Sequence, residues 1–204
     1  MKDQREQRIL SVLHKRQPGI TILLENVFDP HNISAVMRTC DSVGINTIHT
    51  LFTQKPPHNH TGFRSSAGTW KWMKVEEHQH PEECIEALKM QYGRVFAAHM
   101  APDALSIFDV DFTKPVAIAF GNEQNGCSPA LLDLCDGTIS IPQVGLVQSL
   151  NISVACAITL YEAYRQKSNA GHYNQPSLPE SEIKKIFEEW TDFKTIREKK
   201  QRKP

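Results

Sequence analysis

The sequence predicts an α/β fold with a mainly parallel sheet and helices on both faces. Short apolar runs alternate with segments of helical spacing along most of the chain, as in βαβ units. The run Val116 to Phe120 is continuously apolar, which is typical of a strand buried on both faces. The segment Ile152 to Tyr164 carries no charge before Glu162, so we expect a helix buried nearly all round.

Local signals place the elements of the first half. Pro18-Gly19 ends a terminal helix, and Asp29-Pro30 supplies an N-cap and a proline for the first turn of the next helix. Gly44 marks the end of that helix. The expected elements are a helix over 3–16, a strand over 21–25, a helix over 30–44, a strand over 45–52 and a polar loop over 53–66.

The second half repeats the alternation. Ser128 begins a short helix, and Asn151 is a good N-cap for the uncharged helix because its side-chain oxygen can accept from free backbone N–H groups. The expected elements are strands over 71–76, 94–98, 116–120 and 138–141, and helices over 81–91, from 128, over 152–164 and over 179–193.

Composition narrows the class of protein. At 204 residues and 40% apolar content, the chain suits one compact domain with short terminal additions. No apolar run reaches the roughly 18–20 residues that cross a bilayer, and the charged N-terminus is unlike a secretory signal. Five scattered cysteines without a Cys-x-x-Cys motif fit a reducing compartment. We therefore expect a cytoplasmic protein with no membrane contact.

Basic residues gather at the two ends although the formal net charge is zero. Residues 1–16 hold five basic and two acidic side chains, and residues 194–204 hold six basic and one acidic. Such segments could bind phosphates, or they could be a solvated helix and a frayed tail. Charge alone leaves both interpretations open.

Three polar segments follow predicted strands, at the edge where parallel α/β sheets bind ligands. They are residues 25–32, residues 121–126 around Glu123, and residues 142–151. Any one of them could be a simple turn, but three together indicate a ligand site. There is no Gly-x-Gly-x-x-Gly after the first strand, no Walker A motif and no Gly-x-Ser-x-Gly elbow. The pairs His58/His60 and His78/His80 lack a convincing partner set, so we expect no metal.

Three motifs carry a family resemblance. They are Asn-Val-Phe-Asp-Pro-His-Asn-Ile-Ser-Ala-Val-Met-Arg-Thr-Cys-Asp (26–41), Phe-Gly-Asn-Glu-Gln-Asn-Gly (120–126) and Ile-Pro-Gln-Val-Gly-Leu-Val-Gln-Ser-Leu-Asn-Ile-Ser-Val-Ala (141–155). In order and spacing they resemble the SPOUT-class RNA 2′-O-methyltransferases, most of all the TrmH subfamily, which methylates a guanosine in the tRNA D-loop. The resemblance covers about residues 8–173, including Arg-Gln-Pro (16–18) and Asn-Ala-Gly-His-Tyr (169–173).

The resemblance implies features that the residues alone do not. Family members form a C-terminal trefoil knot, against the usual rule that chains are unknotted. They bind S-adenosylmethionine in the knot, and they are homodimers with the last helix at the interface. The implied division is an N-terminal helical RNA-contacting extension (1–19), a SPOUT methyltransferase domain (20–168) and a charged helical C-terminal extension (169–204).

The resemblance also assigns catalytic roles. Arg38 is implied as the principal catalytic residue, and because arginine stays protonated we expect it to bind phosphate and stabilise a developing alkoxide rather than act as a base. Asn32 is expected to hold Arg38 and the third motif, and Glu123 to brace the loop or Arg38. Ser149 and Asn151 are expected to shape the site.

The resemblance also implies residues that bind the cofactor, and the positive charges indicate residues that bind RNA. Main-chain groups near Ala98, Gly121, Ile141 and Leu150 are implied to bind S-adenosylmethionine, and Ala98 stands where the family has threonine. RNA is expected to be held electrostatically, with steep salt dependence. The expected RNA-binding residues are Arg8, Lys15, Arg16, Arg64, Arg165 and Lys167.

The expected function is methylation of the 2′-hydroxyl of a guanosine in the tRNA D-loop, guanosine 18 by family resemblance. Two alternatives stay open at this point. The chain could methylate ribosomal RNA or another tRNA position, or it could be a non-catalytic RNA-binding dimer.

Overall fold

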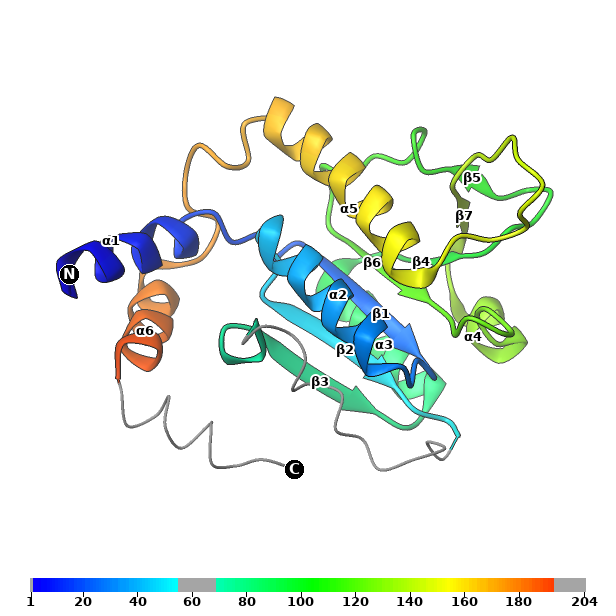
Figure 1. The fold of residues 1–204 in the computed structure, drawn as a ribbon, viewed down its shortest axis with the longest axis horizontal. Coiled ribbons are helices and arrows are strands. Elements are labelled where there is room, and N and C mark those ends of the chain that lie inside the picture. Colours follow the sequence, from blue (N-terminus) through cyan, green and yellow to red (C-terminus); the bar gives the residue numbers. More distant parts are fainter. Residues whose placement is uncertain (1, 55–68, 193–204) are drawn as a thin grey trace.

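A computed structural model describes residues 2–54 and 69–192 of the chain. Its centre is a seven-stranded sheet in which every described pairing is parallel, with strand order β3-β2-β1-β6-β4-β7-β5 (Figure 1). The predicted α/β class with a parallel sheet is therefore confirmed. The strands are β1 (Ile20–Glu25), β2 (Thr47–Leu51), β3 (Lys74–His78), β4 (Val95–Ala98), β5 (Leu105–Ser106), β6 (Val116–Phe120) and β7 (Gly137–Ser140).

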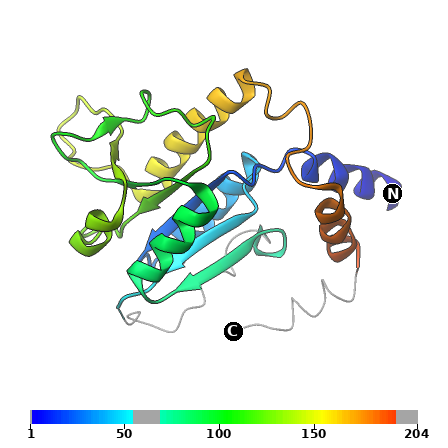
Figure 2. The same cartoon turned by 180° about the vertical axis from the view of Figure 1, so that it is seen from behind.

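Helices cover both faces of the sheet, as the sequence predicts. On one face α2 packs against α5, and on the other α3 packs against α4 (Figures 1 and 2). A buried hydrophobic cluster lies under each pair of helices. The helices are α1 (Lys2–Leu13), α2 (Pro30–Ser42), α3 (Pro81–Tyr92), α4 (Pro129–Leu134), α5 (Ile152–Asn169), α6 (Glu180–Thr191) and a 3₁₀ turn (Thr69–Lys71).

The expected helix caps are present, and the predicted strands differ from the structure at β3 and β5. Asp29 accepts a hydrogen bond from His31 N at the start of α2, and Ser128 accepts one from Leu131 N at the start of α4. The strand expected from residue 71 begins at Lys74, because the 3₁₀ turn occupies the preceding residues. The two-residue strand β5 was not predicted, since it is too short to show a periodic pattern.

The terminal helices α1 and α6 lie side by side at one end of the molecule (Figure 1). Their apolar faces form a third buried cluster that includes Ile9, Leu13, Ile183 and Trp190. Trp190 also meets the ring of Trp72 edge to face, with ring centroids 5.2 Å apart. The two extensions are therefore packed on each other and on the sheet domain as far as residue 192.

Helix α5 is not buried all round in a single chain, so that expectation was wrong. Its inner side packs on α2 and is buried at Cys156 and Leu160. Its outer side exposes Val154, Ile158, Tyr161 and Tyr164. The lack of charge in the sequence indicated that this face is apolar, but not whether the same chain or a second chain covers it.

The trefoil knot stays a prediction from the resemblance. No described helix is both long enough and apolar enough to span a membrane.

Candidate active site

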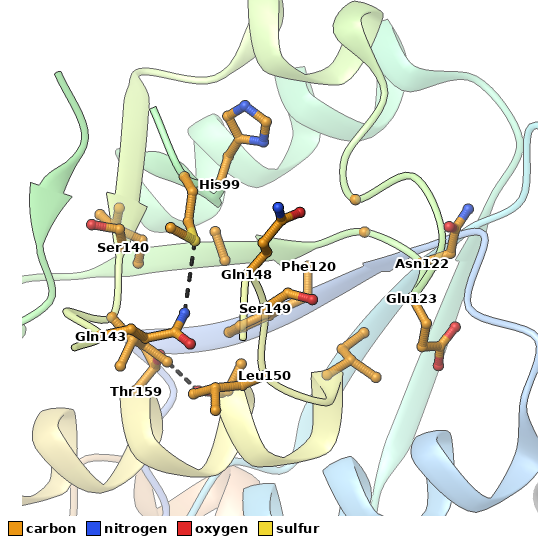
Figure 3. A pocket seen from close by; sticks show the side chains of 18 of the residues that line it. His99, Phe120, Asn122, Glu123, Ser140, Gln143, Gln148, Ser149, Leu150 and Thr159 are labelled. Carbon is orange, nitrogen blue, oxygen red and sulfur yellow. Dashed lines mark hydrogen bonds between the residues drawn. The ribbon is translucent and has the colours of Figure 1, made fainter. Parts of the chain in front are cut away.

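A cavity of about 430 Å³ lies at the carboxyl edge of the sheet, between the segments that follow β4, β6 and β7 and the start of α5 (Figure 3). Ala98, Gly121, Ile141 and Leu150, the four residues expected around the cofactor, all line it. They come from separate segments of the chain, because parallel strands deliver their following loops to one edge. The structure thus brings the predicted cofactor residues together around one cavity.

The walls of the cavity are apolar with a few polar side chains. Phe120, Ile139 and Ile152 supply apolar wall, while Gln143 and Ser149 supply polar groups (Figure 3). Gln143 Nε2 lies 3.7 Å from the sulfur of Met100, and Gln143 Oε1 is buried without a hydrogen-bond partner in the described structure. Such an apolar pocket with few, placed polar groups is typical of a small-molecule site.

The loop after β6 is closed by backbone contacts that require Gly121. A Cβ on this residue would lie 1.8 Å from the carbonyl carbon of Gly126, so no larger side chain fits without moving the loop. Gly126 N donates to Asn122 O over 3.0 Å, and Asn122 Oδ1 accepts from the backbone N–H groups of Gln124 and Asn125. The loop is a compact turn whose shape depends on its own backbone.

A polar network joins the three sequence motifs at the rim of the cavity. Asn32 is buried on α2 and donates through Nδ2 to Glu123 Oε1 over 2.5 Å. Its Oδ1 accepts from Asn151 Nδ2 over 3.1 Å, while Asn151 Oδ1 caps α5 by accepting from Ser153 N. Asn32 Nδ2 also lies 3.3 Å from Asp29 Oδ2. One buried amide therefore connects the first motif to the second and the third.

Arg38 is placed apart from this network. It lies on the exposed side of α2, and it forms no hydrogen bond or ion pair with any residue in the described ranges. It is six residues beyond Asn32, which is about 240° around a helix, so the two side chains leave α2 in different directions. The expected contact between Asn32 and Arg38 is therefore absent, and Asn32 holds Glu123 and Asn151 instead. Among residues 2–54 and 69–192, nothing neutralises the charge of Arg38.

Two of the expected RNA-binding residues are buried, which corrects their assignment. Arg16 is fully buried: its guanidinium pairs with Asp41 over 2.7 Å, donates to Ile45 O over 3.0 Å and lies over the ring of Trp190. Burial lowers the pKa of Arg16, and the pairing with Asp41 opposes that shift. Lys167 is 3% exposed, and burial lowers its pKa too. Neither side chain is available at the surface.

The other expected RNA contacts have different surroundings. Arg8 and Lys15 are exposed at or just after α1. Arg165 is exposed but makes two hydrogen bonds to Glu162, at 2.9 and 2.7 Å. Arg64, the pair His58/His60 and the basic segment 194–204 lie outside the described residues.

Sequence reasoning missed three residues that support the site. Asp29 was identified as a helix cap, but its second oxygen also reaches Asn32. Glu25 is 1% exposed and accepts from both Ser128 N and Ser128 Oγ, which ties the end of β1 to the start of α4. Gln143 was treated only as part of a polar loop. A carboxylate at the end of a buried strand is the signal that could have identified Glu25.

Comparison with known proteins gives consistent results. Residues 19–161 match the SpoU rRNA Methylase family. The tRNA (guanosine(18)-2′-O)-methyltransferase of Thermus thermophilus is 43% identical over 92% of this chain and 96% of its own length. The enzyme of the same name from Escherichia coli K12 is 38% identical over 92% of this chain and 82% of its own length.

Solved structures agree with the sequence relatives. The A. aeolicus TrmH/SpoU tRNA modifying enzyme superposes with a TM-score of 0.84 and 36% identity, covering 93% of this chain and 96% of that one. The SpoU methyltransferase AviRb from Streptomyces viridochromogenes, in complex with AdoMet, gives a TM-score of 0.65 and 28% identity over 76% of this chain and 59% of its own.

Proposed function

Because this chain belongs to the SpoU methylase family, we propose that it transfers a methyl group from S-adenosylmethionine to the 2′-hydroxyl of guanosine 18 in tRNA. One observation carries the proposal: the three motif segments meet at one cavity and are joined there through Asn32, Glu123 and Asn151. The tRNA assignment rests on relatives of that name that match over nearly the whole chain.

The residues around the cavity fit S-adenosylmethionine. Ala98, Ile141 and Leu150 can enclose an adenosine, while the compact loop that Gly121 permits can present its main-chain groups to the ligand. The unpaired oxygen of Gln143 is an acceptor that an amino group of a ligand would satisfy. When bound, the sulfonium supplies the electrophilic methyl carbon and the leaving group.

In this proposal Arg38 acts through its positive charge and not as a general base. Its guanidinium stays protonated and can fork to a phosphate, which would orient the adjacent ribose and stabilise alkoxide character at the 2′-oxygen. Glu123 is already engaged by Asn32, so its part is to position the loop after β6. Ser149 lines the cavity beside Leu150 and helps to shape the acceptor side.

The enzyme acts as a homodimer in this proposal, with α5 at the interface. Val154, Ile158 and Tyr161 are spaced as one helical face, and all three are exposed in the single chain. A self-complementary apolar stripe suits a twofold interface. Ile158→Asp should convert the protein from dimer to monomer in sedimentation equilibrium, whereas Met90→Asp on the opposite side should leave it dimeric. A wild-type protein that sediments as a monomer would rule out the dimer.

RNA binding is assigned to exposed basic side chains at the ends of the molecule, Arg8 and Lys15 among them, in the extension 1–19. The charged extension 169–204 helps the methyltransferase domain 20–168 to bind tRNA. The reaction takes place in the cytoplasm in this proposal. Affinity for tRNA should then fall steeply as salt rises.

The deciding experiment uses labelled S-adenosylmethionine and unmodified transcripts. Wild-type protein should label tRNA at guanosine 18, and a tRNA carrying 2′-deoxyguanosine there should accept no label. A ribosomal RNA transcript is the control for the alternative substrate. Label mapped to another tRNA position or only to ribosomal RNA would replace the proposed substrate, and no transfer to any RNA would favour a non-catalytic binding dimer.

A further inference from the structure

Three side chains that can bind a metal lie together on the sheet face covered by α3, away from the cofactor cavity. His49 on β2 is directly opposite Glu76 on β3 in the parallel register, and His78 follows two residues later. Residues paired in register and residues two apart point to the same face of a sheet. The ring of Tyr92 from α3 meets the ring of His49 edge to face, which places the cluster under that helix.

The spacing of the three side chains matches a metal site. Their ligand atoms all lie within 4.8 Å of one another. His49 Nδ1 is 3.1 Å from His78 Nε2 and 3.5 Å from Glu76 Oε2. A tetrahedral Zn²⁺ with bonds of about 2.0–2.1 Å holds its ligand atoms roughly 3.3 Å apart. Side-chain rotations of a small size would therefore suffice to receive the ion.

The protonation states also suit metal binding. His49 is 2% exposed, and burial lowers its pKa to about 4, so the ring is neutral near pH 7. Its Nε2 has no hydrogen-bond partner in the described structure. The ring proton can therefore stay on Nε2, because no neighbouring donor requires Nε2 to act as the acceptor. The Nδ1 lone pair can thus face Glu76 and His78.

Glu76 is a charged carboxylate with one oxygen to spare. Partial burial alone would raise its pKa, but the hydrogen bond and the positive charge of Lys74 lower it overall. Lys74 Nζ donates to Oε1 over 2.5 Å, which leaves Oε2 directed toward His49. The carboxylate can therefore keep its ion pair and still bind a cation.

We propose that His49, Glu76 and His78 bind one Zn²⁺ ion, with the fourth ligand position open to water. Two imidazoles and a carboxylate form a ligand set that zinc accepts readily. The ion would fasten β3, the strand at the edge of the described sheet, to β2. This site departs from the expectation of no metal, and its partner for His78 is His49, not the neighbouring His80. The proposal does not depend on the methyltransferase assignment.

Calorimetric titration of ZnCl₂ into metal-stripped full-length protein tests the site. Wild type should bind one ion per chain. His49→Ala and Glu76→Gln should each weaken binding at least about tenfold, since even the loss of an outer-shell partner weakens metal sites by 10–100-fold. His80→Ala is the matched control, because His80 is exposed at the start of α3 and should leave the affinity unchanged.

A second measurement guards against a variant that does not fold. Zn²⁺ should raise the melting temperature of wild type and of His80→Ala, but not that of Glu76→Gln or His78→Ala, because a ligand stabilises only the state that binds it. The proposal would be overturned if wild type showed no saturable binding, or if the variants at His49, Glu76 and His78 bound Zn²⁺ as tightly as wild type. The contact between His49 Nδ1 and His78 Nε2 would then be a side-chain hydrogen bond without a role in metal binding.

Discussion

The cavity at the carboxyl edge of the sheet and the junction of α1 with α6 differ in how far the positions of their residues could be predicted from sequence. At the cavity, all four residues expected around the cofactor line the same space. At the junction, Arg16 was expected on the surface and is instead fully buried against Asp41 and Trp190. The family resemblance, carried by motifs at strand ends, thus predicted which residues line the cavity, whereas positive charge alone did not predict which basic side chains are exposed.

The physical reason lies in what determines each position. A loop after a parallel strand reaches the carboxyl edge whatever the rest of the chain does. The burial of an arginine depends on which distant segments pack over it, and here these are the end of α2 and the C-terminal helix. Local sequence contains the first kind of information and not the second.

The largest expected effect is on catalysis at the active site. Arg38→Ala should lower the rate of methyl transfer about a thousandfold, the upper range for loss of one group that stabilises developing charge. Affinity for S-adenosylmethionine should stay within about twofold, because Arg38 does not line the cavity. Single-turnover kinetics and equilibrium dialysis measure the two quantities. Full activity in this variant would refute the proposed role of Arg38.

At the junction, Arg16→Ala should reduce the free energy of unfolding by about 3 kcal/mol, because loss of a fully buried side chain leaves a cavity and Asp41 loses its partner. Urea denaturation measures this loss. The exposed neighbour Lys15 is the matched control, and Lys15→Ala should change stability by less than about 0.5 kcal/mol. A stable Arg16→Ala protein with weakened tRNA binding would restore Arg16 to the RNA-binding residues.

A smaller effect tests the backbone of the cavity. Gly121→Ala forces the loop after β6 away from Gly126, at a cost of about 2 kcal/mol. Affinity for S-adenosylmethionine should then fall roughly thirtyfold by equilibrium dialysis. Gly145→Ala in the third motif is the control, since its added Cβ would meet nothing within 4 Å. Equal affinities in the two variants would show that the shape of this loop does not matter for the cofactor.

Much of the fold and part of the site could be predicted because their causes are local. The uninterrupted apolar run of β6 indicated a buried central strand, and the structure buries all five of its residues. Asp29 and Asn151 were expected as N-caps, and both accept backbone hydrogen bonds there. Each of these features depends on a few consecutive residues.

The features that join distant segments depend on how the whole chain packs. This packing made Asn32 the bridge between Glu123 and Asn151, buried Lys167, and brought His49 to Glu76 and His78. Consecutive residues were enough to predict most of the elements, the N-caps at Asp29 and Asn151 and the edge of the sheet at which the candidate cavity lies. Burial and side-chain pairing were decided by tertiary packing, because the free energy of a buried charge or amide depends on neighbours that only the folded chain brings within contact.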